Sequence, residues 1–473
     1  MKVLFVYPNV TRAKSPQLGI CMLAGITQQL GHECDLYDLT IIPDGEEIPT
    51  FQSKLEEFDP NLVAISCRSN EWVFLKELFQ SVNLNKTLVV FGGPHATVSP
   101  DEVIKIGDIV VLGEGEETFS ELLQKISNKK DISNIKGCWV KQEGKIMKNE
   151  MRNLISNLDD LPFPYWKIFD DIHYYGSYIK RLFKGANVVG TFECSRGCPY
   201  ACTYCTNDYV RRLYKGKGKW RREKSPERII RELQLFRDEY GLDCVYFIDE
   251  VVLTHVNRLE KFRDLYRPEI GVPFVFMERP ENITDKKVSI IKQAGAKIVS
   301  IGIESGDENL RKTLLNRKHS QETIILAFQI AKRHGLITHA FTMIGFPGED
   351  IKSYKETFKL LRKARPNTVQ TTIFFPLKGT QIFEKVVKER FFDPNTPMPQ
   401  NYYEKSSLNF SKRKQKELLR YQYLFSHYNS KLLFHGYLPK ILLTIAMFSP
   451  YVLNKLRKEG FLSTLKAIWR KIV

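Results

Sequence analysis

Between Glu193 and Thr206 the chain reads E-C-S-R-G-C-P-Y-A-C-T-Y-C-T, and this stretch is the strongest indication of the fold around it. Cys198, Cys202 and Cys205 have the spacing C-x3-C-x2-C and directly follow a predicted strand, 187–193. Iron–sulfur cubanes normally have four cysteine ligands. Three thiolates on one loop would bind three irons and leave the fourth open to a small molecule, as in other metal sites with a vacant position.

A fourth cysteine, Cys194, keeps an alternative open. With it the stretch becomes C-x3-C-x3-C-x2-C, which would suit a closed four-thiolate zinc or iron–sulfur site. Zinc sites usually pair two C-x2-C arms on separate turns, which this stretch lacks. Cys194 also falls at the predicted strand end, where a cysteine can pack like any small hydrophobe. The pattern therefore favours the open cluster.

Short apolar stretches continue after the cysteines, with helical patterns between most of them. The strand candidates are 187–193, 243–248, 273–277, 297–303, 337–344 and 368–374, and Ser225 and Ser320 mark two helix starts. This alternation predicts a parallel α/β sheet, and six units are two short of a closed eightfold barrel. We therefore expect a partial TIM-like (β/α)6 barrel over 186–400, open on one side to a large substrate.

The first 125 residues alternate in the same way. Their strand candidates are 2–7, 33–37, 61–67, 87–91 and 108–112. The pattern predicts a Rossmann-like α/β domain over 1–125, with helices on both faces of a parallel sheet. Ligands of such sheets bind beyond the carboxyl ends of the strands. Residues 126–185, with polar turns, prolines and aromatic residues, are expected to form a connector.

The stretch R-G-C-P-Y-A-C-T-Y-C resembles the signature of the radical S-adenosylmethionine (radical SAM) superfamily. The chain to about residue 390 resembles its class with an N-terminal cobalamin-binding domain, whose partial six-unit barrel agrees with the strand count above. The resemblance implies a 4Fe–4S cluster on Cys198, Cys202 and Cys205, with S-adenosylmethionine bound at the open iron. The reduced cluster would cleave this cofactor to methionine and a 5′-deoxyadenosyl radical.

The resemblance also implies contacts with S-adenosylmethionine. Tyr204, just before the last cysteine, is similar to the family residue beside the adenine. Glu304 and Ser305 close the fourth barrel strand in a segment like the one that contacts the ribose and the amino-acid part. Arg317 lies where relatives place a basic residue for the cofactor carboxylate, and Gly345 lies in a loop like the one beside the adenine. The ordinary alternatives are a helix-start acid for Glu304 and a turn glycine for Gly345.

Three segments of the first domain, 16–19, 92–97 and 113–116, resemble cobalamin-domain radical enzymes and fall at the expected ligand edge. They imply cobalamin contacts by Gly93, His95, Gly113 and Glu114, although His95 could simply bond nearby backbone. The motif D-x-H-x-x-G, which supplies a lower cobalt ligand in other cobalamin proteins, does not follow the first strand. A literal match at 171–176 lies in the connector, and we interpret it as coincidence. The alternative is a domain that has lost cobalamin and serves as a lid.

Charge is concentrated at the C-terminal end. The whole chain has a net charge of +17, and residues 401–473 alone have a net charge of +11, from 14 basic and three acidic residues. Such a basic amphipathic helical segment suits shallow insertion into an anionic membrane leaflet, or packing as a cap on the barrel. Binding of nucleic acid ranks last, because no RNA-binding module follows the barrel. The odd number of cysteines, nine, and the lack of an export signal or a spanning apolar run predict a cytoplasmic protein, either free or peripheral on the membrane's inner face.

Together these features predict an enzyme that methylates an unactivated carbon of a small-molecule or lipid-like substrate. Its cofactors would be the 4Fe–4S cluster, S-adenosylmethionine and cobalamin, with flavodoxin or ferredoxin as electron donor. Alternatives are radical cyclisation or rearrangement without methyl transfer, and a closed-cluster sensor. A tRNA-modifying methylthiotransferase-like enzyme would need a second cluster, for which Cys21, Cys34 and Cys67 are the candidates. No catalytic residue acting on substrate is identified, although Asp249 and Glu250 fall on the barrel rim.

Overall fold

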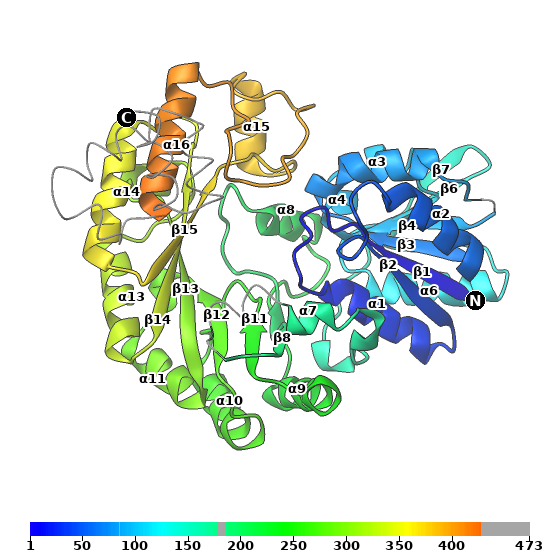
Figure 1. Ribbon diagram of the computed structural model, residues 1–473, viewed down its shortest axis with the longest axis horizontal. Coiled ribbons are helices and arrows are strands. Elements are labelled where there is room, and N and C mark those ends of the chain that lie inside the picture. The colour runs from blue at the N-terminus through cyan, green and yellow to red at the C-terminus, as the bar shows by residue number, and fades with distance from the viewer. Residues whose placement is uncertain (85, 177–182, 184, 427–473) are drawn as a thin grey trace, which may run out of the picture.

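The chain folds into two α/β units joined by a connector that packs against both (Figure 1). The computed structural model describes residues 1–84, 86–176, 183 and 185–426. The N-terminal unit is built on one sheet and the second unit on another, and both sheets are mainly parallel. This arrangement confirms the predicted fold class.

The N-terminal unit has a parallel sheet in the order β2-β1-β3-β4-β5. Along β1, Leu4 and Val6 belong to a core shared with α2 and α3, while Val3 and Phe5 belong to a core shared with α1 and α6. Because successive side chains of a strand point to opposite faces, both faces of the sheet are buried under helices. The elements are β1 (Lys2–Tyr7), α1 (Leu18–Gln29), β2 (Glu33–Asp38), α2 (Glu47–Phe58), β3 (Leu62–Ser66), η1 (Ser69–Glu71), α3 (Trp72–Ser81), β4 (Leu88–Gly92), α4 (Gly93–Val98), α5 (Pro100–Val103), β5 (Ile109–Val111) and α6 (Glu116–Ser127).

The first part of the expected connector extends this sheet, which the sequence analysis did not foresee. β6 (Cys138–Gln142) and β7 (Lys145–Lys148) form a hairpin that pairs antiparallel with β5, which makes the sheet seven-stranded. Glu143 and Gly144 join the strands with positive φ of 49° and 74°, as in a two-residue hairpin turn. Cys138 and Val140 are buried against the domain core. The remaining connector elements are η2 (Leu158–Asp160), η3 (Trp166–Ile168) and α7 (Ile172–Tyr175).

The second unit is the predicted partial barrel. Its six parallel strands lie side by side in the order β8-β11-β12-β13-β14-β15, and helices α9, α10, α11, α13 and α14 cover the outer face of this sheet (Figure 1). The predicted helix starts are confirmed, since Ser225 Oγ accepts from Arg228 N at 3.0 Å and Ser320 Oγ accepts from Thr323 N at 3.2 Å. The elements are β8 (Val189–Phe192), β9 (Ser195–Arg196), α8 (Thr206–Leu213), β10 (Arg222–Glu223), α9 (Pro226–Tyr240), β11 (Cys244–Phe247), α10 (Val256–Glu269), β12 (Phe274–Glu278), η5 (Pro280–Asn282), α11 (Asp285–Ala294), β13 (Ala296–Glu304), α12 (Glu308–Thr313), α13 (Gln321–Arg333), β14 (Ile337–Ile344), α14 (Ile351–Ala364), β15 (Thr368–Ile373), α15 (Gln381–Lys388) and α16 (Lys412–Ser426).

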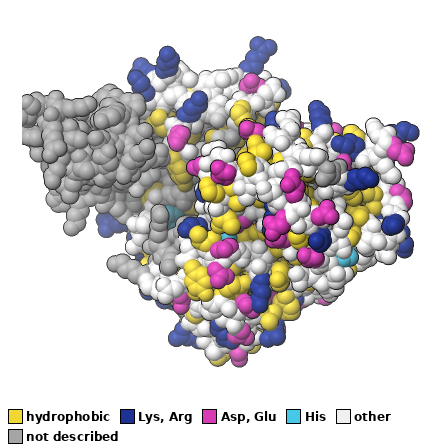
Figure 2. Space-filling view, turned by 45° about the vertical axis from the view of Figure 1, so that its right-hand side comes forward, with side chains coloured by type: hydrophobic (Ala, Val, Ile, Leu, Met, Phe, Trp, Pro, Cys, Tyr) yellow, Lys and Arg dark blue, Asp and Glu magenta, His cyan; other side chains and the backbone are white. Residues whose placement is uncertain are grey.

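The start of the basic C-terminal segment packs on the barrel. Of the two roles considered for this segment, membrane insertion and a cap on the barrel, residues up to Ser426 therefore have the second. Leu418 and Phe425 of α16 are fully buried, and Gln422 Nε2 donates to Thr371 O on β15 at 3.1 Å. Residues 427–473, which carry the rest of the predicted membrane segment, lie outside the described residues. Within the described part, no helix combines the length and apolarity that a membrane span requires. On the face shown in Figure 2, acidic and basic side chains are interspersed.

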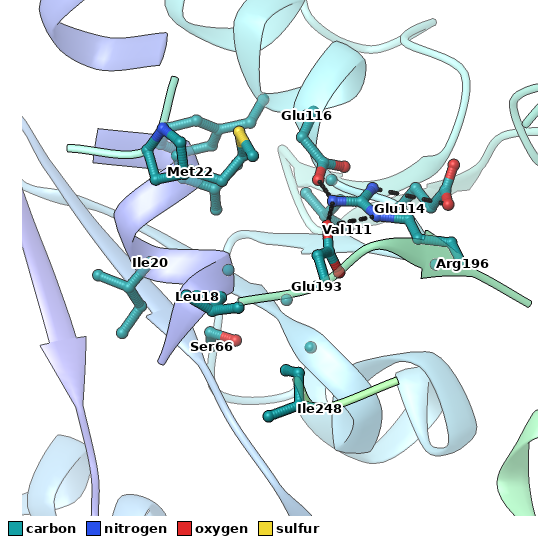
Figure 3. Close-up of a pocket in the computed structure, with 18 of the residues that line it drawn as sticks. Leu18, Ile20, Met22, Ser66, Val111, Glu114, Glu116, Glu193, Arg196 and Ile248 are labelled. Atoms are coloured by element: carbon teal, nitrogen blue, oxygen red, sulfur yellow. Dashed lines mark hydrogen bonds and ion pairs between the residues drawn. The ribbon is translucent and has the colours of Figure 1, made fainter. Parts of the chain in front are cut away.

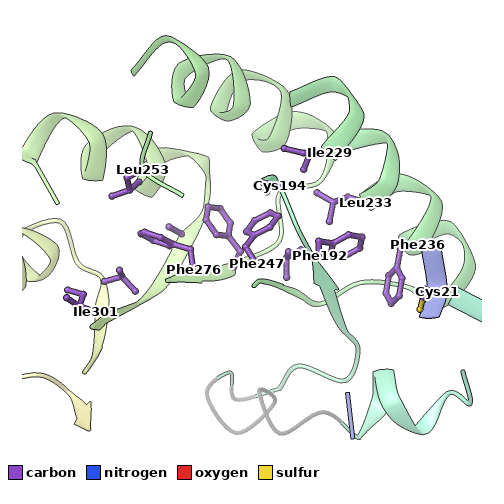
Figure 4. Packing of buried hydrophobic residues seen from close by; sticks show 14 of the residues in the cluster. Cys21, Phe192, Cys194, Ile229, Leu233, Phe236, Phe247, Leu253, Phe276 and Ile301 are labelled. Atoms are coloured by element: carbon purple, nitrogen blue, oxygen red, sulfur yellow. The ribbon is translucent and has the colours of Figure 1, made fainter. Parts of the chain in front are cut away.

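The two units share one continuous hydrophobic core, part of which is shown in Figure 4. Trp166 of η3 packs against Phe192 and Phe236 of the barrel, with ring centroids 5.9 and 5.5 Å apart. On the other side the connector lies on α1, where Tyr165 N donates to Cys21 O at 2.8 Å. The connector therefore holds the carboxyl ends of the first sheet against the mouth of the barrel.

Candidate functional site

The cysteine loop connects β8 to α8 at the carboxyl end of the barrel. Cys198 and Cys202 are buried, and Cys205 is half-buried directly before α8. Gly197 has φ +84°, and a Cβ there would lie 2.2 Å from Trp220 O, so only glycine allows this close approach. Trp220 Nε1 donates to Cys198 O at 2.7 Å. The loop is therefore held from outside by the segment that precedes β10.

The three thiols lie in surroundings that suit metal ligation. Burial raises the pKa of Cys198 to about 11 and that of Cys205 to about 12, so a free thiolate is disfavoured and a bound cation would stabilise it. Cys202 Sγ accepts a hydrogen bond from Arg279 Nη1 at 3.0 Å. Among the described residues, no three His, Cys, Asp or Glu side chains converge as ligands of one metal ion. A cubane requires a different arrangement, because each thiolate binds a separate iron.

Cys194 lies apart from these three thiols. It belongs to the hydrophobic core together with Ile229 and Phe247 (Figure 4). Its backbone N donates to Asp249 Oδ2 at 2.8 Å, and burial raises the pKa of its thiol. It therefore packs as a small apolar residue, as the sequence predicts, rather than as a fourth ligand on the loop.

Three of the residues expected to contact S-adenosylmethionine meet at the carboxyl ends of the barrel strands. Arg317 Nη1 donates to Tyr204 Oη at 3.2 Å and to Glu304 Oε1 at 3.3 Å. Arg317 Nη2 donates to Gly302 O at 2.5 Å. Glu304 has φ +65°, a conformation that is uncommon outside glycine and costly unless its surroundings impose it. A phenol, a guanidinium and a carboxylate are thus held together beside the cysteine loop.

Ser305 and Gly345 are placed differently from these three. Ser305 is fully buried, and its Oγ accepts from Asp307 N at 3.2 Å. Gly345 has φ +90°, its N donates to Glu349 Oε2 at 2.6 Å, and an added Cβ would lie 2.5 Å from Leu418 Cδ1. Burial raises the pKa of Glu349 to about 8. Ser305 and Gly345 therefore shape the backbone behind the cluster of polar groups, and Gly345 also lets α16 approach.

A cavity of about 410 Å³ lies between the carboxyl ends of the first sheet and the mouth of the barrel (Figure 3). The N-terminal unit contributes Leu18, Ser66, Gly93, Gly113 and Glu114, and the barrel contributes Glu193, Arg196, Ile248 and Asp249. The edge expected to bind cobalamin and residues 195–197, at the start of the cysteine loop, therefore face one common space, whereas Cys198, Cys202 and Cys205 do not line it. Neither half of the chain predicts this cavity by itself.

The residues expected to contact cobalamin divide into two groups. Gly93, Gly113 and Glu114 line the cavity, whereas His95 does not. His95 turns away from it, packs on Trp72 with ring centroids 4.8 Å apart, and lines a separate cavity. Burial lowers its pKa to about 4. The glycines follow the sheet edge, but the α4 turn directs the histidine to the other side.

Ion pairs of Arg196 with acidic residues of both units form one wall of the cavity (Figure 3). Arg196 Nη2 lies 2.6 Å from Glu116 Oε1 and 2.9 Å from Glu193 Oε1. Arg222 forms a two-pronged pair with Glu114, with Nη2–Oε1 at 2.7 Å and Nη1–Oε2 at 2.8 Å. This network was not predicted from the sequence. The available signal was the pairing of G-E-G-E at one strand end with arginines flanking the cysteine loop.

Asp249 is a buried carboxyl group on the barrel side of the cavity. It is 2% exposed, its Oδ1 accepts from Ser195 Oγ and its Oδ2 accepts from Cys194 N. Burial raises its pKa from 3.8 to about 7. Glu250 is exposed instead, and its Oε1 accepts from Asn207 Nδ2 at 2.7 Å. With this pKa, the Asp249 carboxyl group can hold or release a proton near neutral pH.

The other candidates from the sequence have structural roles. His173 of the D-x-H-x-x-G match is fully buried in the connector, and its Nε2 lies 2.5 Å from Asp38 Oδ2, away from the residues that line the cavity. The proposed cysteine trio for a second cluster does not meet. Cys21 and Cys67 belong to hydrophobic cores on opposite faces of the first sheet, and Cys34 lies on the edge strand β2. All nine cysteines are free thiols.

Comparison with known proteins agrees with this geometry. The family model of the radical SAM superfamily matches residues 192–361, and that of the B12 binding domain matches residues 8–123. The chain is a radical SAM protein with a B12-binding domain. A 4Fe–4S cluster, S-adenosylmethionine and cobalamin are the cofactors of these two domains. The matched ranges cover the cysteine loop and the sheet edge that lines the cavity.

Relatives of this radical SAM protein share most of its length. An uncharacterized methyltransferase of Pyrococcus horikoshii is 28% identical over 404 residues, covering 82% of this chain and 83% of the relative. An anaerobic magnesium-protoporphyrin IX monomethyl ester cyclase of Rubrivivax gelatinosus is 22% identical, covering 82% and 70%. Among solved structures, the cobalamin-dependent S-adenosylmethionine radical enzyme OxsB, with aqua-cobalamin and S-adenosylmethionine bound, has a TM-score of 0.69 at 16% identity, covering 94% of this chain and 70% of that one. This likeness supports the two-unit fold.

Proposed function

We propose that this protein methylates an unactivated carbon of a small-molecule or lipid-like substrate. The observation that carries the proposal is the cavity of about 410 Å³ between the ligand edge of the first sheet and the barrel residues that begin the cysteine loop and follow β11. When bound, S-adenosylmethionine and the cluster supply a radical that removes a hydrogen atom from the substrate, and cobalamin supplies the methyl group. The chain's task is to hold the reacting carbon between them and away from water.

The residues offered for each cofactor follow from their positions. Cys198, Cys202 and Cys205 would hold the cluster, which their burial and their separation from Cys194 support. The polar group around Arg317 would bind the amino-acid part of S-adenosylmethionine, because a guanidinium pairs with a carboxylate. Tyr204 and Glu304 belong to the same group. Ser305 and Gly345 would contribute to S-adenosylmethionine binding indirectly, by fixing the backbone behind these polar side chains.

On the other side of the cavity, Gly93 and Gly113 would shape the loops at the sheet edge against which the corrin would lie. Both have positive φ, of 88° and 69°, and side chains at these positions would collide with neighbouring groups. Asp249 would hold or release a proton at the substrate end, while Glu114 is engaged with Arg222. The ion-pair wall between the two units would limit the entry of water.

Anaerobic reconstitution with iron, sulfide and cobalamin tests the proposal. With S-adenosylmethionine carrying a deuterated methyl group, we expect about four irons per chain, 5′-deoxyadenosine after reduction, and the deuterated methyl group on the bound cobalamin. Cys202→Ala should abolish 5′-deoxyadenosine formation, whereas Cys194→Ala, its matched control from the same stretch, should retain it. Loss of activity in both variants, or in neither, would contradict the ligand assignment.

Radical cyclisation without methyl transfer is the second candidate, because one relative of similar coverage is named as a cyclase. It predicts 5′-deoxyadenosine with no methyl group on cobalamin in the same experiment. A methylthiotransferase-like enzyme predicts about eight irons, since it needs two 4Fe–4S clusters. A closed-cluster sensor predicts a cluster that forms without any cleavage of S-adenosylmethionine.

We further propose that the protein works in the cytoplasm with a flavodoxin or ferredoxin as reductant, and that the basic C-terminal segment contacts an anionic membrane. Because α16 belongs to the barrel core through Leu418 and Phe425, the segment to remove is the one after Ser426. Flotation with phosphatidylglycerol vesicles should recover the full chain but not the chain ended at Ser426. Equal flotation of both would refute the membrane contact and the argument for a lipid-like substrate.

A further inference from the structure

The three thiols of the cysteine loop differ in the groups that hydrogen-bond to them. Cys198 and Cys205 are hydrogen-bonded with the backbone of Tyr200 and Asn207, respectively. Cys202 instead accepts from a charged side chain, Arg279, at 3.0 Å. A sulfur that ligates iron can still accept such a bond, and hydrogen bonds to cluster sulfurs are a known determinant of reduction potential.

Arg279 is held rigidly where it reaches Cys202. It directly follows β12 and is 7% exposed. Its Nε and Nη2 donate to Glu281 Oε1 at 2.9 and 2.6 Å, which leaves Nη1 directed at the sulfur. Its guanidinium lies 3.7 Å over the ring of Tyr200, within the cysteine loop itself. All three nitrogens of the guanidinium therefore have assigned partners, and the planar group cannot rotate without losing several contacts.

Glu281, the acidic partner of Arg279, also contacts a second basic side chain, His319. Glu281 Oε2 lies 3.2 Å from His319 Nδ1, and the His319 side chain is only 3% exposed. Although burial opposes ionisation of Glu281, its close contact with His319 and its hydrogen bonds from Arg279 hold its pKa well below the usual value. The result is a row of groups, His319, Glu281, Arg279 and Cys202, in which a carboxylate partly offsets the cation beside the sulfur.

We propose that Arg279 is a positioning residue that orients Cys202 and raises the reduction potential of the cluster, and that Glu281 moderates this effect. Reduction adds one electron to the cluster, supplied by the electron donor, and its negative charge is stabilised by the cation at the sulfur. Electrostatic interactions of this kind are strong where water is excluded. The inference rests on the cluster being held by Cys198, Cys202 and Cys205, not on which reaction follows.

Potentiometric titration with dithionite, followed by electron paramagnetic resonance of the reconstituted protein without S-adenosylmethionine, tests the inference. In Arg279→Gln we expect the reduced-to-oxidised ratio at a fixed potential to fall at least tenfold, which corresponds to a midpoint lower by about 59 mV for one electron. Arg279→Lys keeps the charge and should recover part of this shift. Glu281→Gln removes the opposing charge and should shift the midpoint in the other direction.

Arg228→Gln is the matched control. Arg228 is also a largely buried arginine, with its side chain 9% exposed, stacked 3.8 Å over the ring of Phe163 and paired with Glu232 at 2.8 Å. Its other hydrogen bonds go to the backbone oxygens of Asp159 and Pro162 rather than to a cluster cysteine. It should leave the midpoint unchanged. A purely structural role for Arg279 would lower the iron content without opposite shifts in the Arg279 and Glu281 variants.

The possible results distinguish the effect of Arg279 on the reduction potential from the assignment of the three cysteines as cluster ligands. Four irons in every variant with an unchanged midpoint would overturn the inference and leave the cluster assignment intact. If Arg279→Gln does not retain a cluster, Arg279→Lys and Glu281→Gln decide, and unchanged midpoints in both would refute the proposal. A wild-type protein that binds no cluster would instead refute the ligand assignment itself.

Discussion

Replacing Glu114 by Gln tests whether this residue joins the two units or serves cobalamin alone. Glu114 was expected from the sequence to contact cobalamin, but in the structure its carboxylate makes a two-pronged pair with Arg222, which is 3% exposed. Removing one partner of a buried pair costs about 3–5 kcal/mol, because the other charge remains buried without compensation. Since Glu114 is 17% exposed, we expect the lower end, about 3 kcal/mol.

The assay is urea unfolding of the cofactor-free protein, followed by tryptophan fluorescence. Glu117→Gln is the control, because Glu117 is 52% exposed and lies 3.8 Å from Arg152, so its loss should cost under about 1 kcal/mol. Combining Glu114→Leu with Arg222→Met should cost less than Glu114→Gln alone, since no buried charge is left unpaired. If Glu114→Gln is no more destabilising than Glu117→Gln, the ion pair does not join the units as argued.

Three further predictions concern the cavity and the domain contact. Burial raises the folded pKa of Asp249 from 3.8 to about 7, so its stabilising contribution is present at acid pH and is lost as pH rises between these values. Asp249→Asn should therefore flatten the pH dependence of the free energy of unfolding, measured with urea, over this range. An unchanged pH dependence would contradict the prediction. Gly25→Ala should destabilise by about 1–3 kcal/mol, since its Cβ would lie 2.4 Å from Phe163 O, whereas Gly19→Ala in the same helix meets open space and should not lower the melting temperature. His95→Ala should leave the amount of bound corrin unchanged, because His95 does not line the cavity; a large loss would show that its position matters to cobalamin.

Local patterns were sufficient for the architecture of both units. The strands are short apolar runs bounded by turns, and burial on both faces makes several of them easy to recognise, as in 2–7 or 61–67. The hairpin of β6 and β7 was missed because its strands carry lysines and its outer strand is largely exposed. The signal available for the hairpin was a weak alternation of apolar and polar residues on either side of a Glu143-Gly144 turn.

The candidate site could be predicted from the sequence only where its functional residues lie close together along the chain. The spacing of Cys198, Cys202 and Cys205 sets three thiols on one loop, and the position of Cys194 at a strand end points it into the core. In contrast, His95 follows two glycines that line the cavity, yet its own side chain turns away because α4 begins there. One residue of difference along a helix turn changes the side on which a side chain lies.

By itself, the sequence determined the two parallel sheets, the three-cysteine loop and the ligand edge of each domain, because all of these depend on residues close together along the chain. The tertiary structure alone decided that the two edges face one cavity, that Glu114 and Glu116 meet Arg222 and Arg196, and that Arg279 reaches Cys202. These contacts join residues 77 to 108 positions apart. Their partners are selected by how the connector packs the units together and by the burial of opposite charges, which no local pattern encodes.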